Sequence, residues 1–296
     1  MAYSTTAINV NRGTSGIALN PEQSREVWAN ATQQSVIMQL AQRVTLPGPG
    51  LTIDVITGDI EASWIAESTE KHVSANTFSS KTMKPYKLAA IMLFSNEFRR
   101  DKAALYEEIV RRAPAAIGKK FDETVFAGTT PGTGFDVLTA ATQVGLGANV
   151  YDQLVAAKEA VATSGGMLNG WAISPQGESI LLGAKDGDSR PLFLTDINAQ
   201  SAVSRIFGAP VILSKNVYAT GTPNVVGVAG DWSQMRYGIV EGIRVDISDE
   251  ATINDGTNQI NLWQRNMFAV RVEAEVGCVV KSTGAFVLLT DEVESA

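Results

Sequence analysis

The sequence predicts an α+β fold without internal repeats, and three observations support this prediction. Residues 101–128 have the length and apolar spacing of a long amphipathic helix, and helices and strands alternate in the segment that follows. From Tyr237 onward the pattern becomes mostly β. The 296 residues suffice for two domains, or for one large domain with an inserted subdomain, and can bury a sizeable core.

The first 50 residues are predicted to form an arm that ends in a helix. Residues 1–20 are rich in Ser, Thr, Asn and Gly and lack a helical period, which indicates an extended segment. Asn20 is a favourable N-cap and Pro21 suits the first helical position, so we expect a helix from there to about Arg43. The Pro-Gly-Pro-Gly run at 47–50 then ends the helix.

A long polar β-hairpin is predicted after the arm. Residues 51–57 alternate and favour β-branched side chains, as a strand does. Residues 58–87 scatter their large apolar side chains and have no glycine after Gly58, whereas a flexible linker would be richer in glycine. Such a hairpin cannot bury a face within its own subunit, so we expect it to lie on another surface. An apolar strand, Lys87–Phe94, follows.

The helix over 101–128 is the longest predicted element. Asp101 suits the N-cap position, and Gly128 is a typical signal for the C-terminal end. Two glutamates, at 107 and 108, precede two arginines by four positions each, a spacing that stabilises an exposed helix face. Pro114 is expected to kink or locally break the helix, because it lacks a backbone donor. Residues 129–134 form a boundary.

The rest of the chain is predicted to form shorter helices and strands. We expect helices over 151–163 and 176–182, and strands over 171–174, 210–213, 224–229, 267–276 and 285–289. The side chains of 267–276 alternate between two faces. One face carries Phe268, Val270, Val272, Ala274 and Val276, and the other carries Met267, Ala269, Arg271, Glu273 and Glu275.

Scarce residue types exclude several classes of enzyme. The single cysteine, Cys278, cannot form an internal disulfide, which fits folding in a reducing compartment. The lone histidine, His72, cannot supply the two or three imidazoles of a His-rich zinc or iron site. Any Ser-His mechanism would have to use His72 itself. We expect His72 to be an exposed surface residue and Cys278 to be a buried, inert thiol.

Known binding motifs for nucleotides and calcium are missing from the sequence. The chain has neither a phosphate-binding GxxxxGK[ST] loop nor a GxGxxG run after a strand. Gly145-Leu146-Gly147 lacks the third glycine and is predicted to be a loop, and Asp186-Gly187-Asp188 lacks the later glutamate of a calcium loop and is predicted to be a turn. We therefore expect no cofactor, no metal and no catalytic site.

Charge is unevenly distributed along the chain. The net charge of -7 argues against a protein that binds nucleic acid over its whole surface. Residues 81–120 carry ten basic and four acidic side chains, whereas residues 241–296 carry ten acidic and four basic ones. These two segments can pair within one chain, pair between copies, or form two solvated faces. No window reaches the about 20 apolar residues of a membrane span, and 1–20 lack a secretory signal, so we expect an intracellularly made protein without a membrane partner.

Five stretches, taken in order, carry a family resemblance. They are Ala62–Glu67 with Phe78-Ser79, Lys87–Phe98, Phe121–Gly128, Gly208–Val211 and Asn266–Glu273. In this order they resemble the extended loop, the strand before a long "spine" helix, the end of that helix, a loop and strand of the middle, and the penultimate strand of the tailed-bacteriophage major capsid protein. This family has the Hong Kong 97-type capsid fold.

The resemblance implies a division of the chain into four parts. They are an N-terminal arm (1–50), an extended loop or E-loop (51–86), a peripheral (P) domain (87–131 and 237–276) that holds the spine helix, and an inserted axial (A) domain (132–236 and 277–296).

The resemblance also implies a structural function. Family members self-assemble as pentamers and hexamers into an icosahedral shell that encloses double-stranded DNA, which we expect to be contacted non-specifically. Other expected partners are a portal, decoration proteins and a separate scaffolding protein. A separate protein is expected because Met1 lies close to the arm, without the long helical N-terminal extension that acts as a fused scaffold in some relatives. Such a protein is located in the virion after assembly in the host bacterial cytoplasm. An encapsulin-type nanocompartment shell around protein cargo is the alternative, but the arm before Asn20 and the long hairpin favour a phage.

Some relatives lock the shell with an isopeptide bond between a lysine and an asparagine, assisted by a glutamate. By position, Lys71, Asn266 and Glu273 correspond to these three residues. A neutral lysine amine would attack the carboxamide while the carboxylate handles the proton. Because Glu273 lies seven positions after Asn266, an ideal strand would point the two side chains to opposite faces. The resemblance therefore implies a site built from several subunits, or no site.

Overall fold

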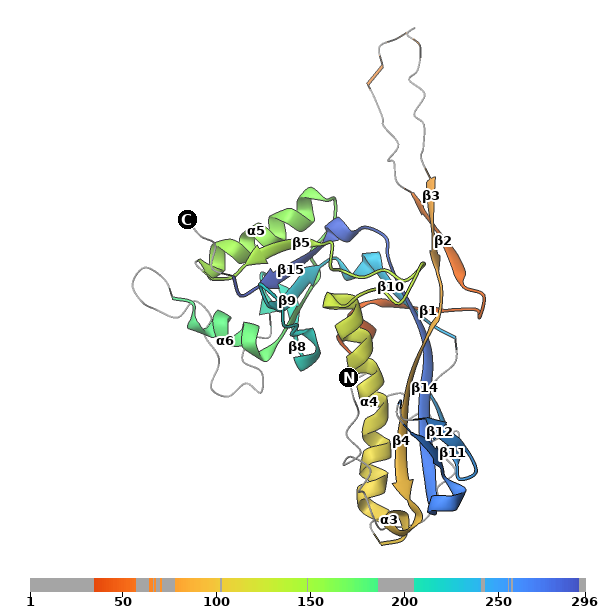
Figure 1. Cartoon of the computed structure of the whole chain (residues 1–296). Helices are drawn as coiled ribbons and strands as arrows, with labels where there is room; N and C mark the ends of the chain where they lie inside the picture. Colours follow the sequence, from red (N-terminus) through yellow and green to blue (C-terminus); the bar gives the residue numbers. More distant parts are fainter. Residues whose placement is uncertain are drawn as a thin grey trace.

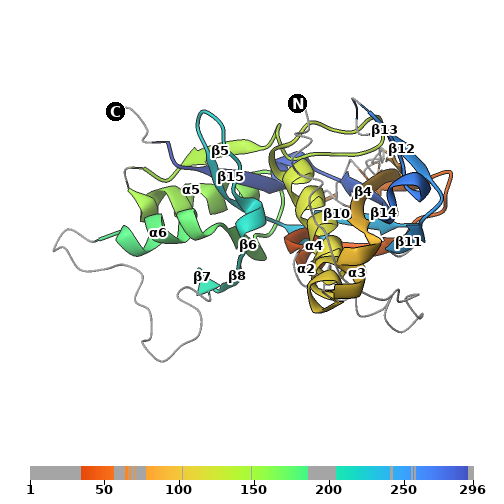
Figure 2. The same ribbon diagram turned by 60° about the horizontal axis from the view of Figure 1, so that its bottom comes forward.

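The computed structural model describes residues 35–56, 64–65, 67, 70, 78–101, 103–147, 149–185, 205–240, 243–254, 256 and 258–292. These residues form an elongated unit and a compact unit, which lie side by side in both views (Figures 1 and 2). A two-stranded hairpin projects from one end of the elongated unit (Figure 1). The protein is a mixed α+β protein, as the sequence predicts.

A five-stranded sheet runs along the elongated unit (Figure 1). Its central strand, β14 (Met267–Val280), pairs antiparallel with β4 (Tyr86–Ser95) on one side. On the other side β14 pairs antiparallel with β11 (Arg244–Ser248) and β10 (Met235–Ile239), and β10 pairs in parallel with β1 (Gln42–Thr45). The strands predicted over 87–94 and 267–276 are confirmed, and β14 continues four residues further.

The alternation of β14 builds the core of the elongated unit. All five side chains that the pattern places on one face are buried: Phe268, Val270, Val272, Ala274 and Val276. This face packs in one hydrophobic cluster with α4 (Ala103–Ala127), which contributes Phe121. The ring of Phe94 from β4 lies 5.5 Å from that of Phe268, centroid to centroid. A strand with apolar side chains at every second position therefore buries one face under a helix.

Helical structure begins earlier in the chain than predicted. α3 (Asn96–Asp101) directly follows β4, and the Ser95 hydroxyl oxygen accepts a hydrogen bond from a backbone N–H of its first turn (3.1 Å). Asp101 is the last residue of α3, so its predicted N-cap role is wrong. α4 ends directly before Gly128, as predicted. It is continuous through Pro114, so the predicted break is absent there.

The helix predicted for the end of the arm stops sooner than Arg43. α2 (Val36–Leu40) is followed by Ala41 in an extended conformation (φ −84°, ψ 159°), and the next four residues form β1. The edge of β10 offers unpaired backbone groups, and pairing with them outweighs the helical pattern of the local sequence. The predicted start of this helix at Asn20 lies outside the described residues.

The base of the predicted hairpin is confirmed. β2 (Leu51–Ile56) and β3 (Phe78–Met83) pair antiparallel from Leu51 opposite Met83 to Ile56 opposite Phe78. A Cβ added at Gly238 or Gly277, which pair across β10 and β14, would lie less than 3 Å from the Met83 side chain. At its base the hairpin therefore buries Ile53 and Met83 in a cluster with Leu46 and Val279 of the same chain. The expectation that the hairpin buries no face within its own subunit is wrong for this part.

The compact unit contains a six-stranded sheet and two helices. The strand order is β5 (Thr142–Gly145), β15 (Phe286–Thr290), β9 (Val225–Gly230), β6 (Gly170–Ile173), β8 (Ala209–Leu213) and β7 (Arg205–Ile206). The helices are α5 (Val150–Thr163) and α6 (Pro175–Gly183), and their buried faces share a hydrophobic cluster with this sheet. The predicted strands and helices of this part of the sequence are confirmed.

Short elements complete the described part of the chain. They are the hairpin of β12 (Thr252–Asn254) and β13 (Gln259–Asn261) and the 3₁₀ turns η2 (Lys215–Val217), η3 (Trp232–Gln234), η4 (Trp263–Arg265) and η5 (Thr283–Ala285). Within the described residues, no helix is long and apolar enough to cross a lipid bilayer.

Candidate functional site

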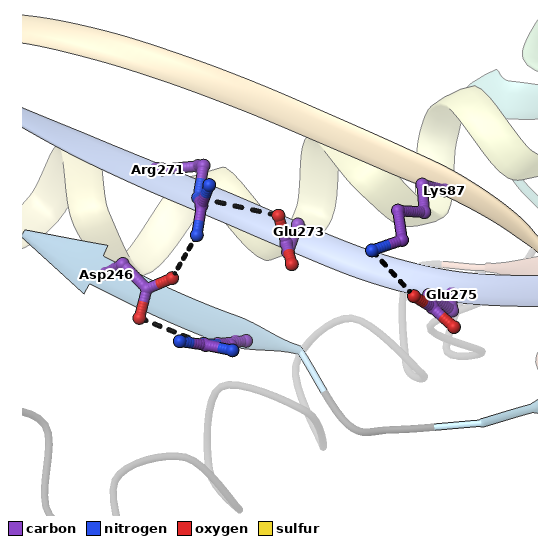
Figure 3. A network of polar contacts seen from close by, with 6 residues as sticks. Lys87, Asp246, Arg271, Glu273 and Glu275 are labelled. Carbon is purple, nitrogen blue, oxygen red and sulfur yellow. Dashed lines mark hydrogen bonds and ion pairs between the residues drawn. The ribbon is translucent and has the colours of Figure 1, made fainter. Parts of the chain in front are cut away.

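Charged side chains line the face of β14 that points away from α4 (Figure 3). Lys87 Nζ on β4 lies 2.9 Å from a carboxylate oxygen of Glu275. Arg271 lies 2.6 Å from Asp246 on β11 and 3.4 Å from Glu273. Arg244 Nε contacts the same Asp246 at 3.0 Å. We call these six residues the charged ladder.

The charged ladder joins the basic and acidic segments of the sequence within one chain. Lys87 belongs to the basic segment and Glu275 to the acidic one, and their hydrogen bond raises the pKa of Lys87. The hydrogen bond from Arg271 lowers the pKa of the Asp246 carboxyl below its ordinary value. Partly exposed ion pairs of this kind contribute little to the free energy of unfolding, so the main effect of the ladder is a polar surface on this face of the sheet.

A buried carboxylate connects three separate parts of the chain. The Asp122 side chain on α4 accepts hydrogen bonds from the Ser35 hydroxyl (2.7 Å), from the backbone N–H groups of Val36 (2.9 Å) and Ile37 (3.4 Å), and from the Asn216 side chain (3.1 Å). Burial raises its pKa to about 6, although these hydrogen bonds oppose the rise. Asp122 thereby holds the start of α2 and the turn η2 against α4.

The sequence analysis missed the role of Asp122. One signal for it exists: α4 buries Phe121, Val125 and Phe126, and Asp122 lies on the same helical face. A carboxylate on a buried face needs hydrogen-bond donors, and their identity depends on segments far away in the sequence.

The three residues predicted for a crosslink do not come together within one chain. Asn266 ends η4 with a left-handed backbone (φ 52°, ψ 45°), whereas Glu273 lies in the middle of β14 beside Arg271. At about 3.3 Å per residue, seven positions separate them by roughly 20 Å. Lys71 lies outside the described residues.

The contacts of Asn266 are made instead with α3. The Asn96 side-chain amide donates to Asn266 Oδ1 (2.9 Å), and Asn266 Nδ2 donates to Glu97 Oε1 (3.3 Å). These partners are 170 and 169 positions away in the sequence, so the pattern of residues gave no sign of them.

Cys278 is fully buried, as predicted, and burial raises the pKa of its thiol far above the ordinary value. The loop predicted at 145–147 begins one residue later than expected, because Gly145 is the last residue of β5; the next residue, Leu146, is buried. The predicted turn at 186–188 and His72 lie outside the described residues. Among the residues that are described, no group of His, Cys, Asp and Glu is arranged to hold a metal ion.

Comparisons with known proteins agree with one another. The profile described as "Phage capsid family" matches residues 15–291. The probable major capsid protein gp17 of Mycobacterium phage L5 is 36% identical over 295 residues, which cover 92% of this chain and 89% of that protein. A solved structure from Gordonia phage Cozz is 27% identical with a TM-score of 0.71, and the likeness covers 88% of this chain and 87% of that one. The capsid of an empty GTA particle, computed with C5 symmetry, shares the fold at a TM-score of 0.65 and 16% identity, over 95% of this chain and 93% of that one.

The fold and these likenesses define a structural protein of a viral shell. These solved structures share the fold of this chain over 88% and 95% of its length. The chain belongs to the phage capsid family, and it is a major capsid protein of the tailed-phage type. Its place is therefore the capsid of the virion.

Proposed function

We propose that copies of this chain assemble as pentamers and hexamers into an icosahedral shell that encloses double-stranded DNA. Family membership supports this, and the observation that carries it is the projecting hairpin. Trp64, within the span between β2 and β3, is fully exposed, and Ile65 is 41% exposed. An exposed aromatic residue that no core of its own subunit covers is typical of a contact surface.

The division into an N-terminal arm (1–50), E-loop (51–86), P domain (87–131 and 237–276) and A domain (132–236 and 277–296) is part of this proposal. The elongated unit with α4 would correspond to the P domain, the compact unit to the A domain, and the hairpin of β2 and β3 to the base of the E-loop. A separate scaffolding protein, a portal, decoration proteins and packaged DNA are the proposed partners, and the host bacterial cytoplasm is the proposed place of assembly. The phage relatives disfavour the encapsulin alternative.

Electron microscopy of the purified protein tests the assembly. We expect rings or closed shells when the protein is concentrated or expressed with a scaffolding protein. Monodisperse monomers under all of these conditions would contradict the proposal.

We further propose that the shell is locked by an isopeptide bond between Lys71 of one copy and Asn266 of another. In this reaction the lysine nitrogen bonds to the carboxamide carbon, the bond from that carbon to Nδ2 breaks, and ammonia leaves. Glu273 lies far from Asn266 in its own chain, so it can take part in this reaction only if it comes from a third copy. A denaturing gel of mature particles decides: bands above the monomer are expected, and Asn266→Asp should abolish them. Mature wild-type particles that run only at 31.5 kDa would overturn this proposal.

A further inference from the structure

A small cavity opens beside Asn266, where η4 meets β14. Its volume is about 140 Å³. It is lined by Asn96, Asp249, Leu262, Trp263, Asn266 and Met267. The two apolar residues of the floor, Leu262 and Met267, are buried, whereas the Trp263 side chain is 73% exposed. A cavity with an apolar floor, an exposed indole wall and a carboxylate at its rim can accept a long aliphatic side chain that ends in a positive charge.

Within this cavity the carboxamide of Asn266 is held at both ends. Asn96 donates to its oxygen at 2.9 Å, and its nitrogen donates to the Glu97 carboxylate at 3.3 Å. The backbone N–H of Asn96 also donates to the Asn266 carbonyl oxygen at 3.0 Å, which fixes the left-handed turn from which the side chain projects. The carboxylate can only accept, so the amide nitrogen must face Glu97 and the amide oxygen must face Asn96.

This arrangement suits acyl transfer at the amide carbon. An N–H donor on the carbonyl oxygen stabilises the negative charge that develops there when a nucleophile adds. A carboxylate on the amide nitrogen lies next to the group that has to leave, where it can carry a proton. Glu273 of the same chain lies roughly 20 Å away and cannot do so.

We propose that Asn96, Glu97, Asp249 and Trp263 form, within one subunit, an acceptor site that orients Asn266 and receives a lysine side chain from a second copy of this chain. The inference rests on the proposed crosslink and adds the residues that recognise the lysine and act on the leaving nitrogen. The lysine stem packs on Trp263, and the carboxylate of Asp249 attracts its ammonium group. Attraction of a cation also fits the acidic balance of residues 241–296.

The chemical step balances without any co-reactant. The bound lysine first loses one proton from its ammonium group to water. The neutral amine nitrogen then bonds to the Asn266 carboxamide carbon, and Asn96 donates to the resulting oxyanion. The proton that the amine loses passes through the Glu97 carboxylate to Nδ2. The carbon–Nδ2 bond then breaks, ammonia leaves, and Glu97 is again a carboxylate.

The test measures how fast monomer is converted to crosslinked species on denaturing gels, in shells that electron microscopy shows to be normal. Glu97→Gln keeps an acceptor for Asn266 Nδ2 but cannot carry the proton, so we expect a rate roughly 100-fold lower and a changed pH profile. Trp263→Ala and Asp249→Asn should each slow the reaction roughly 10-fold, because the lysine is then less well placed. Trp263→Phe should restore most of the rate.

Glu250→Gln is the matched control for Asp249→Asn, because it removes the neighbouring charge outside the cavity and should leave the rate unchanged. Wild-type rates for Glu97→Gln, Trp263→Ala and Asp249→Asn in crosslinking shells would overturn the acceptor site while the proposed crosslink stands. Wild-type shells without any crosslink would overturn both.

Discussion

The Asp122 carboxylate on α4 accepts a 2.7 Å hydrogen bond from the hydroxyl of Ser35, a residue 87 positions earlier that starts α2. The same carboxylate accepts from Asn216 in η2, 94 positions later. Both Asp122 and Ser35 are fully buried. One side chain thus links the end of the arm, the long helix and the turn η2, and its hydrogen bonds replace the water that burial removes.

Replacing Asp122 should strongly destabilise the subunit. Asp122→Ala leaves the Ser35 hydroxyl, two backbone N–H groups and the Asn216 amide without their acceptor, so we expect a loss of about 2–4 kcal/mol in the free energy of unfolding. Denaturant unfolding of the unassembled protein measures it. Glu123→Ala, at the neighbouring and partly exposed position, is the control and should cost far less. Equal losses for both variants would show that the hydrogen bonds of Asp122 contribute little.

Asp122 should also make stability depend on pH in a defined direction. Its pKa is about 6 in the folded protein, above the ordinary 3.8, so the folded state binds the proton more tightly. The contribution of this group is therefore greatest below pH 3.8 and is lost as pH rises to about 6. The difference corresponds to about 3 kcal/mol.

Comparison of the wild type with Asp122→Asn isolates this effect, because the amide does not titrate. The wild-type free energy of unfolding, relative to that of the variant, should rise as pH falls from 7 to 4. A difference that stays constant over this range would contradict the raised pKa.

The sequence predicted those parts of the fold that local patterns determine. The buried face of β14 follows from alternation within ten consecutive residues, and its strand was predicted correctly. The end of α2 was predicted incorrectly, because Gln42–Thr45 pair with β10, which lies almost two hundred positions later in the sequence. The cap of α3 was missed because the helix was predicted to begin only at Asp101, whereas Ser95 both ends β4 and accepts a hydrogen bond from the first turn of α3.

The candidate sites depended on contacts that no local pattern encodes. Asn266 was singled out by resemblance alone, and its hydrogen bonds with Asn96 and Glu97 arise only because β4 and β14 lie side by side. Likewise, an isolated Asp122 in a helical sequence does not reveal that donors from α2 and η2 surround it.

Lys81 should anchor the direction of the projecting hairpin. Its ammonium group donates to the Val280 carbonyl oxygen (2.6 Å) and contacts Asp136 (3.1 Å), which also accepts from the Val280 backbone N–H (3.0 Å). Because Lys81 and Asp136 are partly exposed, Lys81→Met should cost only about 1 kcal/mol in the free energy of unfolding. The yield of closed shells should fall much more, since the base of the hairpin loses a fixed contact. Lys84→Met is the control; an equal assembly defect in both variants would contradict an anchor specific to Lys81.

The hairpin should be dispensable for folding but required for assembly. Ile56 pairs with Phe78, so an Asn-Gly turn that replaces residues 57–77 can close the two strands with a two-residue loop. We expect this variant to keep the circular dichroism spectrum and unfolding midpoint of the unassembled subunit. The reason is that the described hydrophobic clusters around the hairpin base contain no residue from 57–77. Electron microscopy should show no shells. Shells of normal size and yield would refute the intersubunit role of the hairpin.

Cys278 should react with thiol reagents only after the protein unfolds. It is fully buried in β14, and the raised pKa of its thiol keeps the reactive thiolate scarce at neutral pH. We expect no labelling of the folded subunit during a time in which denatured protein is labelled completely. The substitution Cys278→Ser should cost about 1–3 kcal/mol, because it places a hydroxyl in an apolar cluster, and Cys278→Ala should cost less. Rapid labelling of the folded protein, or a serine variant as stable as the alanine variant, would contradict this description of the core.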